Sequence, residues 1–365
     1  TEGFTAALSE QQERGRQHDR RYDDAGEWLT VREGVADKSV AWESTSTTTE
    51  VLRVRENSES GIWEILLCES PFYAEAGGEV GDTGRIEAVD GSYVFEITDT
   101  QRTPSGITHL GTLLAGQPTP VNLKGPVHAV VDSERRFLIT CNHTATHLLH
   151  AALHDVVSEK AFQAGSLVAP DRLRFDFSFN RPLTGAEVTA LESHVNDNIR
   201  NALTVQIHQD VPREAAEEMG AMAIFGEKYG ETVRVVEVPG KSTELCGGCH
   251  VANTRDIAFF QICSETGVAA GVRRIEAITN RGAFERSIMD RQLLSRLAST
   301  LKTDLGTLES RLSKLIEERS ELSRRVDQLS QRAATDGASA IVDGAAEVNG
   351  VRIAAARIAA NSRDD

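Results

Sequence analysis

His143-Thr-Ala-Thr-His147 opens an apolar run rich in alanine and leucine, and its spacing predicts a helix with both imidazoles on one face. A second pair lies about a hundred residues later in Cys246-Gly-Gly-Cys-His250. Glycines there let the backbone bend sharply and aim two ligands at one point. If the fold brings the pairs together, His143, His147, Cys246 and His250 make a ligand set that suits Zn²⁺. The sequence therefore predicts a metallo-hydrolase or a structural zinc site.

The length and composition indicate a globular chain with two or three domains. The chain has 365 residues, of which 40% are hydrophobic, enough for at least one sizeable core. No apolar run approaches the length of a membrane span. Five cysteines in no regular framework favour a reducing compartment, and we expect the cytoplasm. The net charge of −16 counts against broad nucleic-acid binding, although Arg273, Arg274 and Arg281 offer a local basic patch. Arg273 and Arg274 of this patch are candidate substrate-binding residues.

The periodicity predicts an α+β protein with successive segments. Residues 1–45 are mostly polar, and a few apolar residues near the start recur at helical spacing, which predicts a linker helix. Residues 46–130 hold short β-prone runs separated by turns, which predict a small antiparallel β-barrel. Residues 131–288 alternate between helical and strand signals, which predict an α+β core. The expected barrel strands are 51, 62–67, 93–97, 121–123 and 127–131, and the core elements are helices 143–157 and 185–202 and strands 173–177 and 232–238.

The segment 289–333 has a leucine-rich heptad pattern. Apolar residues from Leu294 to Leu329 keep an alternating 4-3 spacing that only Arg319 interrupts, which predicts one long coiled-coil helix. A long helix packed on its own domain is the alternative. We expect a homodimer through residues 290–332. Residues 334–365 include Val348-Asn-Gly-Val351 between apolar runs, which predicts a hairpin at the start of an incomplete C-terminal domain.

The Cys246-Gly-Gly-Cys249-His250 motif has three interpretations. It matches the Cys-x-x-Cys-His pattern of c-type haem attachment, and its first four residues match a dithiol redox motif. Haem attachment needs an exported route, for which no signal is visible, and the redox motif needs a thioredoxin-like setting. In the third interpretation Cys246 and His250 bind zinc and Cys249 is a bystander. The distant histidine pair favours zinc without excluding the other two.

Other residues near these motifs are candidates for contact with a substrate. The Gly77-Gly78 backbone can approach a ligand closely, and Glu79 beside it is a candidate general base next to a metal. A pair of tight barrel turns is the alternative there. The hydroxyls of Thr144 and Thr146 can orient a substrate, although threonines on a helix surface usually have no such role. His150 lies on the same helical stripe, where we expect a supporting or packing role.

At this point the motifs resemble the editing half of alanyl-tRNA synthetase and its free-standing relatives, which deacylate mischarged tRNA. The matching segments stay in the family's order and reach across most of the chain: 71–84, 142–150, 165–168, 172–177, 220–229, 244–250 and 264–276. The resemblance implies hydrolysis of seryl- and glycyl-tRNA(Ala) in a site that contains zinc. It places the zinc ligands at His143, His147, Cys246 and His250, and it makes the acceptor end of tRNA(Ala) the partner.

Two positions depart from the family's pattern. Glu79 stands where the family usually has glutamine, and Cys249 stands where it usually has threonine. Glu79 introduces a carboxylate into a pocket that must also accept an α-ammonium group. The flanking segments favour a piece of a full synthetase, whose parent activity is alanine–tRNA ligation. A free-standing deacylase and a catalytically weakened tRNA-binding zinc module are the alternatives.

Overall fold

The computed structural model describes residues 27–58, 60–223 and 230–354. The chain divides into two units after Arg286, inside helix α5 (Asn280–Thr300). Most of the predicted linker helix at 1–45 lies outside the described residues. The described part of that segment contains two short strands, β1 (Leu29–Thr30) and β2 (Lys38–Ser39).

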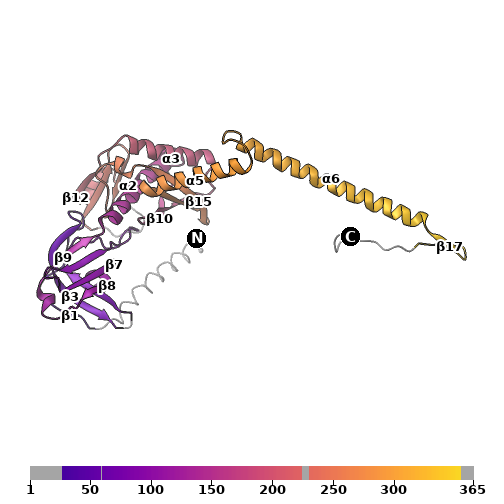
Figure 1. The fold of residues 1–365 in the computed structure, drawn as a ribbon. Helices are drawn as coiled ribbons and strands as arrows, with labels where there is room; N and C mark the ends of the chain where they lie inside the picture. Colours follow the sequence, from indigo (N-terminus) through magenta and orange to yellow (C-terminus); the bar gives the residue numbers. More distant parts are fainter. Residues whose placement is uncertain (1–26, 59, 224–229, 355–365) are drawn as a thin grey trace. The chain divides into compact units, whose positions relative to one another are not determined.

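The first half of unit 1 is a closed antiparallel barrel (Figure 1). Six strands pair in the order β3-β4-β8-β7-β6-β9, and β9 pairs back with β3. Successive side chains of a strand point to opposite faces, so Tyr93, Phe95 and Ile97 of β7 enter the interior together. The predicted small antiparallel barrel is confirmed. Its strands are β3 (Ser46–Asn57), β4 (Ile62–Leu67), β6 (Gly84–Ala88), β7 (Tyr93–Thr103), β8 (Gly106–Gly116) and β9 (Pro126–Val131).

Three details of the barrel differ from the prediction. Strands β6 and β8 were not predicted, and the predicted strand at 121–123 is wrong. The chain forms a short 3-10 helix there, η1 (Asn122–Lys124), and the side chain of Asn122 accepts a hydrogen bond from the Thr119 N–H at 2.6 Å. Such local side-chain bonding competes with strand formation. Leu123 is nevertheless buried in the barrel core, so the apolar signal marked the core and not the backbone conformation.

The second half of unit 1 packs two helices against a four-stranded antiparallel sheet, which confirms the α+β class. The sheet has the order β10-β11-β16-β15, and α2 contacts three of its strands and also α3. Asp132 caps the start of α2, upstream of the predicted start at residue 143, and Thr184 and Glu187 form a capping box at the start of α3. These elements are α2 (Ser133–Val156), β10 (Gln163–Val168), β11 (Leu173–Ser178), α3 (Gly185–Arg200), β15 (Phe260–Ala269) and β16 (Val272–Thr279).

A smaller antiparallel sheet completes unit 1, in the order β12-β13-β14. Its last strand leads directly into Cys246 and contacts α2, so two ligand pairs that are distant in sequence are carried by neighbouring elements. Short strand β5 (Glu69–Ser70) pairs in parallel with β2. The remaining elements are β12 (Gln206–Pro212), α4 (Arg213–Glu218), β13 (Thr232–Val238), β14 (Ser242–Leu245) and η2 (Thr254–Ile257).

Unit 2 contains the C-terminal helices and a hairpin. The prediction of one continuous helix over 289–333 is wrong, because α6 (Leu308–Asp343) follows α5 only after an interruption at 301–307. Lys302 adopts a φ of 51°, and the Asp304 carboxylate accepts the Thr307 N–H at 3.0 Å. Threonine and aspartate favour such local bonds over helix, whatever the heptad spacing. The predicted hairpin is confirmed as β17 (Ala346–Val348) and β18 (Val351–Ile353).

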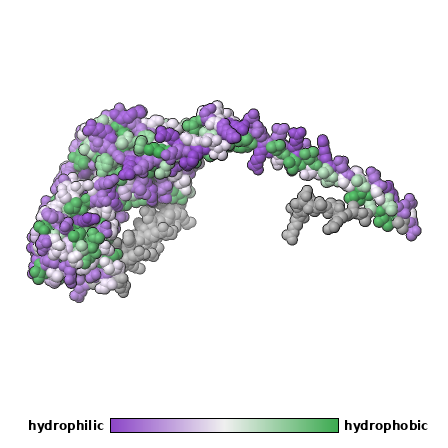
Figure 2. Space-filling model, viewed as in Figure 1, coloured by the Kyte–Doolittle hydropathy of each residue, from purple (hydrophilic) through white to green (hydrophobic). Residues whose placement is uncertain are grey.

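Helix α6 carries an exposed apolar stripe. Figure 2 shows hydrophobic patches alternating with polar ones along this helix. The stripe is typical of a coiled-coil seam, and the homodimer stays a prediction. Its exposed members on α6 include Leu312, Ile316, Leu322, Val326 and Leu329. Among the described residues, no helix combines the length and apolar character that a membrane crossing requires.

Candidate metal centre

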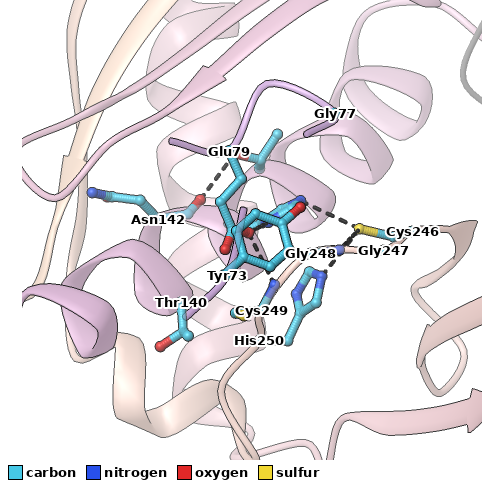
Figure 3. A network of polar contacts seen from close by, with 12 residues as sticks. Tyr73, Gly77, Glu79, Thr140, Asn142, Cys246, Gly247, Gly248, Cys249 and His250 are labelled. Atoms are coloured by element: carbon cyan, nitrogen blue, oxygen red, sulfur yellow. Dashed lines mark hydrogen bonds and ion pairs between the residues drawn. The ribbon is translucent and has the colours of Figure 1, made fainter. Parts of the chain in front are cut away.

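The two predicted ligand pairs meet inside unit 1. His143 and His147 come from α2, and Cys246 and His250 come from the segment that follows β14. Their four potential ligand atoms lie within 4.8 Å of one another. The Cys246 sulfur lies 3.4 Å from Nε2 of His143 and 3.3 Å from Nε2 of His250, and Figure 3 shows the contact between Cys246 and His250. We call these four residues the quartet.

An unsatisfied nitrogen in the quartet fits a metal ion. Helix α2 is buried along most of its length, and buried polar atoms normally have hydrogen-bond partners. The Nδ1 atom of His147 is buried, yet no described residue bonds to it. Three imidazoles and one thiolate are also the donors that zinc takes in tetrahedral sites. The quartet is therefore suited to hold a divalent metal ion.

The electrostatics of the site distinguish Cys246 of the quartet from the nearby Cys249. Burial alone would raise the pKa of Cys246, but His143 and His250 outweigh it and hold the pKa of this thiol well below its usual value. Burial and the Glu79 carboxylate instead raise the pKa of Cys249 well above the usual value. Cys246 is therefore the thiolate, which is the ligand form. Cys249 stays a thiol, and it is buried rather than at the surface.

The proton that the thiol loses is held by a neighbouring imidazole. Burial would lower the pKa of His143, but the Cys246 thiolate and Glu79 raise it to about 10. Burial and the charge of His143 lower the pKa of His250 to about 3. One imidazolium thus faces one thiolate. Because metal ligands must be deprotonated, a bound cation would replace this shared proton.

Each histidine of the quartet has a further partner on its other nitrogen. Nδ1 of His143 bonds to the Glu79 carboxylate, and Nδ1 of His250 lies 3.0 Å from the Thr144 hydroxyl. Nε2 of His147 lies 3.7 Å from a carboxylate oxygen of Glu244. Ligating histidines are commonly oriented by such contacts. The arrangement therefore fixes the direction of all three rings.

Glu244 is a buried carboxylate that the sequence analysis did not identify. It accepts a hydrogen bond from Ser242 at 2.8 Å and lies 3.3 Å from Nδ1 of His150. Burial would raise the pKa of Glu244, but His147 and His150 lower it to about 2. Glu244 is therefore ionised between two histidines. His150 thus lies beside the quartet as an indirect support.

Glu79 lies deep in the site and connects the barrel to both ligand segments. It is 1% exposed, and it accepts a hydrogen bond from the Cys249 N–H at 2.9 Å in addition to its bond to His143. Gly77 and Gly78 precede it in a tight turn with φ values of 59° and 86°. The Gly78 carbonyl accepts the Val168 N–H at 2.7 Å. The role of Glu79 as general base and the substrate contacts of the two glycines stay predictions.

The two predicted threonines have different surroundings. Thr144 bonds to His250 and also accepts the Val251 N–H at 3.2 Å. Its hydroxyl therefore supports residues 246–250, which carry two members of the quartet and which we call the ligand loop. Thr146 donates to the backbone carbonyl of Asn142 one turn earlier, at 2.9 Å. The two hydroxyls therefore have different contacts, and only that of Thr144 touches the quartet among the described contacts.

The predicted basic patch is neutralised by carboxylates. Arg273 pairs with Glu265 at 2.5 and 2.7 Å, and Arg274 pairs with Asp176 at 2.7 and 2.8 Å. Arg281 pairs with Glu285. The described contacts of Arg273 and Arg274 do not include the quartet, so their role in substrate binding stays a prediction.

Two residues that the sequence analysis missed hold the ligand loop by its backbone. Arg234 donates to the carbonyls of Cys246 and Gly248, each at 2.8 Å. The Trp42 indole N–H donates to the carbonyl between them, that of Gly247, at 2.9 Å. The Arg234 guanidinium also lies 4.7 Å from the centre of the Trp42 ring. No motif or spacing signals this pair, because each residue is isolated in the sequence.

A cavity of about 450 Å³ adjoins the quartet. Its lining includes Trp42, Arg136, Thr140, Arg234, Cys249 and His250. A larger cavity of about 740 Å³ lies over β6, β7 and β9 and includes no member of the quartet. The smaller one is the candidate substrate pocket because it combines a shaped volume with the perturbed groups of the quartet.

Comparison with known proteins agrees with this geometry. Residues 233–276 match the family described as Threonyl and Alanyl tRNA synthetase second additional domain, and residues 1–135 match tRNA synthetases class II (A). The chain is 41% identical to the alanine–tRNA ligase of Streptococcus sanguinis over 309 residues, 82% of this chain and 35% of that protein. It is 43% identical to the alanine–tRNA ligase of Chlorobaculum tepidum over 295 residues, 77% of this chain and 33% of that protein.

The chain thus spans about a third of the length of these relatives. The segment matched by the first family model includes β13, β14, Cys246 and His250, so the similarity extends through one ligand pair. Together, these matches and the residues around the quartet lead to one conclusion: the chain belongs to the alanyl-tRNA synthetase family.

Proposed function

We propose that this chain hydrolyses the aminoacyl ester of mischarged tRNA, with seryl- and glycyl-tRNA(Ala) as substrates. The observation that carries the proposal is the position of the candidate pocket. Cys249 and His250 line it, so an ester bound there lies beside the quartet. Membership of the family supports tRNA as the substrate class. The proposed partner is the acceptor end of tRNA(Ala).

The proposed metal is zinc, held by His143, His147, Cys246 and His250. When bound, zinc supplies a Lewis acid for the ester or a fixed contact for the amine and ribose of the substrate. Four protein donors complete a tetrahedral set, which favours the positioning role. Glu79, Thr144 and Glu244 orient the three imidazoles through their other nitrogens.

The pocket walls supply polar groups that can select the substrate. The Thr140 hydroxyl donates to the Phe137 carbonyl at 2.7 Å, which leaves its oxygen free to accept a bond from a serine hydroxyl. A site that hydrogen-bonds a hydroxyl rejects an analogue lacking it by orders of magnitude, roughly 10⁴-fold or more. Thr140 is accordingly the proposed reason that alanyl esters are spared. Arg136 is engaged by Asp82 and serves as a fixed wall.

The proposed function is tested by replacing one ligand and one neighbour on the same helix. His147→Ala is expected to lower both the zinc content and the rate of seryl-tRNA(Ala) hydrolysis. His154→Gln, about two turns further along α2 and outside the quartet, is the control and should retain both. Unchanged hydrolysis by a His147→Ala protein that has lost its zinc would refute the proposal. Circular dichroism on both variants establishes that the fold is kept.

The non-catalytic alternative has one observation in its favour. Glu79 is a carboxylate in a fully buried position where the family usually has glutamine, and its added charge sits beside the ligand His143. A weakened zinc module would bind uncharged tRNA and hold zinc but leave seryl-tRNA(Ala) intact. The same assay therefore separates the two functions. Five cysteines in no regular disulfide framework support a reducing compartment, and we propose the cytoplasm.

A further inference from the structure

Trp42 has an aromatic ring that is fixed in direction and open to the candidate pocket. Its side chain comes from the segment before β3, it is 49% exposed, and it lines the cavity next to His250. The hydrogen bond from its indole N–H to the Gly247 carbonyl sets the orientation of the ring. A fixed, exposed aromatic ring at a polar cavity is the feature on which proteins stack nucleic-acid bases.

A second apolar side chain lines the same cavity. Ile207 of β12 is 42% exposed and lies in the lining with Trp42. An aromatic ring and an aliphatic side chain together suit the faces of a flat heterocycle. The volume of about 450 Å³ lies in the range of roughly 300–1,000 Å³ that is usual for small-ligand sites.

Arg234 supplies the positive charge that a nucleotide needs. Among the described residues, no carboxylate forms an ion pair with it, in contrast to Arg136, Arg273 and Arg274. Its Nε atom is buried and no described residue bonds to it. In a chain of net charge −16, a guanidinium without a carboxylate partner at a cavity wall marks a place for ribose oxygens or a phosphate.

The location of Trp42 relative to the quartet restricts which base it can bind. The ring nitrogen bonds to Gly247, which directly follows the ligand Cys246, and the pocket extends to Cys249 and His250. A base stacked on Trp42 therefore has its ribose next to the quartet. In a charged tRNA, the nucleoside that carries the ester on its own ribose is the terminal adenosine.

We propose that Trp42, Ile207 and Arg234 form the subsite for the terminal adenosine of the tRNA 3′ end, with the adenine stacked on the Trp42 ring. This inference rests on the proposed function of the same pocket. Stacked bases typically lose roughly 5- to 150-fold in affinity when the aromatic residue is replaced by alanine. The subsite thus predicts a preference for a complete 3′ end that depends on the ring of Trp42.

The test measures equilibrium binding of the zinc-loaded full chain to two uncharged hairpin RNAs, one ending in CCA and one ending in CC. The wild-type chain is expected to prefer the CCA end by about tenfold. Trp42→Ala should abolish this preference, while Trp42→Phe, which keeps a ring but loses the indole N–H, should retain most of it. Trp28→Ala is the matched control, because Trp28 also lies against an arginine, 4.5 Å from Arg55, on the barrel.

Two results with the Trp42 variants would overturn the subsite. One is a Trp42→Ala chain that still prefers the CCA end. The other is an equal loss in Trp42→Phe and Trp42→Ala together with loss of zinc, because that result would limit Trp42 to holding the ligand loop. Zinc content is measured for every variant, and Trp42→Leu replaces Trp42→Ala if the smaller side chain prevents folding.

The binding assay also separates this inference from the proposed function, because it uses RNA without an amino acid. Hydrolysis of seryl-tRNA(Ala) without any preference for the CCA end would overturn the adenosine subsite and leave the hydrolase proposal intact. A ring-dependent preference without hydrolysis would support the subsite and count against the hydrolase.

Discussion

Gly248 lies directly against the imidazole of His143, so closely that a methyl group on its Cα would overlap the ring atoms Cε1 and Nδ1. The same methyl group would approach a carboxylate oxygen of Glu79 to 2.5 Å. The neighbouring Gly247 has open space at the corresponding position. The two glycines of the ligand loop are therefore not equivalent. Gly248 must lack a side chain for this close approach, whereas Gly247 has room for one.

This difference predicts opposite results for two alanine substitutions. Gly248→Ala should displace His143 or Glu79 and weaken zinc binding by at least about tenfold, as expected when an orienting contact is lost. Gly247→Ala should bind zinc like the wild type. Competition with a chromophoric chelator measures both affinities. Equal affinities for the two variants would show that the loop can move to accommodate the methyl group.

The two threonines of α2 give a second matched pair. Thr144→Val removes the hydroxyl that orients His250 and also accepts the Val251 N–H, so we expect roughly 10- to 100-fold weaker zinc binding. Thr146→Val removes only a bond to the preceding turn and should leave zinc affinity unchanged. Zinc titration followed by seryl-tRNA(Ala) hydrolysis checks both. A larger loss in Thr146→Val than in Thr144→Val would contradict this assignment.

Stability should depend on pH through a histidine in the barrel. His109 is fully buried between the Ser70 hydroxyl and the Ile65 carbonyl, and burial lowers its pKa to about 4. An unfolded histidine has a pKa of about 6.5, so as the pH falls the unfolded chain takes up this proton first. The free energy of unfolding should therefore decrease by roughly 3 kcal/mol as the pH falls from about 6.5 to about 4, and this contribution should level off below that range.

Urea unfolding at several pH values checks this effect. His109→Gln should show a shallower decrease in stability between about pH 6.5 and 4 than the wild type. His128→Gln is the control, because His128 is exposed on β9 and bonds to Thr48, and it should keep the wild-type slope. Identical slopes for His109→Gln and wild type would exclude His109 as the source.

The exposed stripe of α6 predicts self-association. Burial of Leu322 against a second copy would remove an apolar side chain that is 62% exposed, so the chain should sediment as a dimer. Leu322→Glu, or deletion of residues 290–365, should give monomers. Ser320→Glu places the same charge two residues away on α6 and should leave the dimer intact. A monomeric wild-type chain would reject a homodimer through residues 290–332.

The sequence predicted the elements whose signals are local. Helix α2 and the quartet followed from ligand spacing, and the barrel followed from turns between short apolar runs. Strand β8 escaped because Gly106, Gly111 and Gly116 weaken its β propensity. A methyl group on Gly111 would overlap the Glu96 carbonyl of the neighbouring strand. Close pairing of the two strands therefore requires glycine, the residue type that weakens the strand signal in the sequence. This requirement for glycine can be recognised only once the partner strand is known.

The parts that could not be predicted depend on contacts between distant residues. The Trp42 indole meets Gly247 across 205 positions of sequence, and neither residue belongs to a periodic pattern that includes the other. The prediction of a continuous C-terminal helix failed because of local contacts rather than distant ones. The heptad spacing continues through 301–307, but the side-chain bonds of Asp304 and the positive φ of Lys302 decide the local conformation.

Glu79 reaches His143 from the barrel, and Asp82 of the same segment pairs with Arg136 at the start of the ligand-bearing helix. The barrel is thus a structural component of the candidate metal centre. Chimeras that graft the barrel of one synthetase onto the core of another would exchange the partner of a ligand without exchanging the ligand. Functional hybrids within this family should therefore require that both halves come from the same parent.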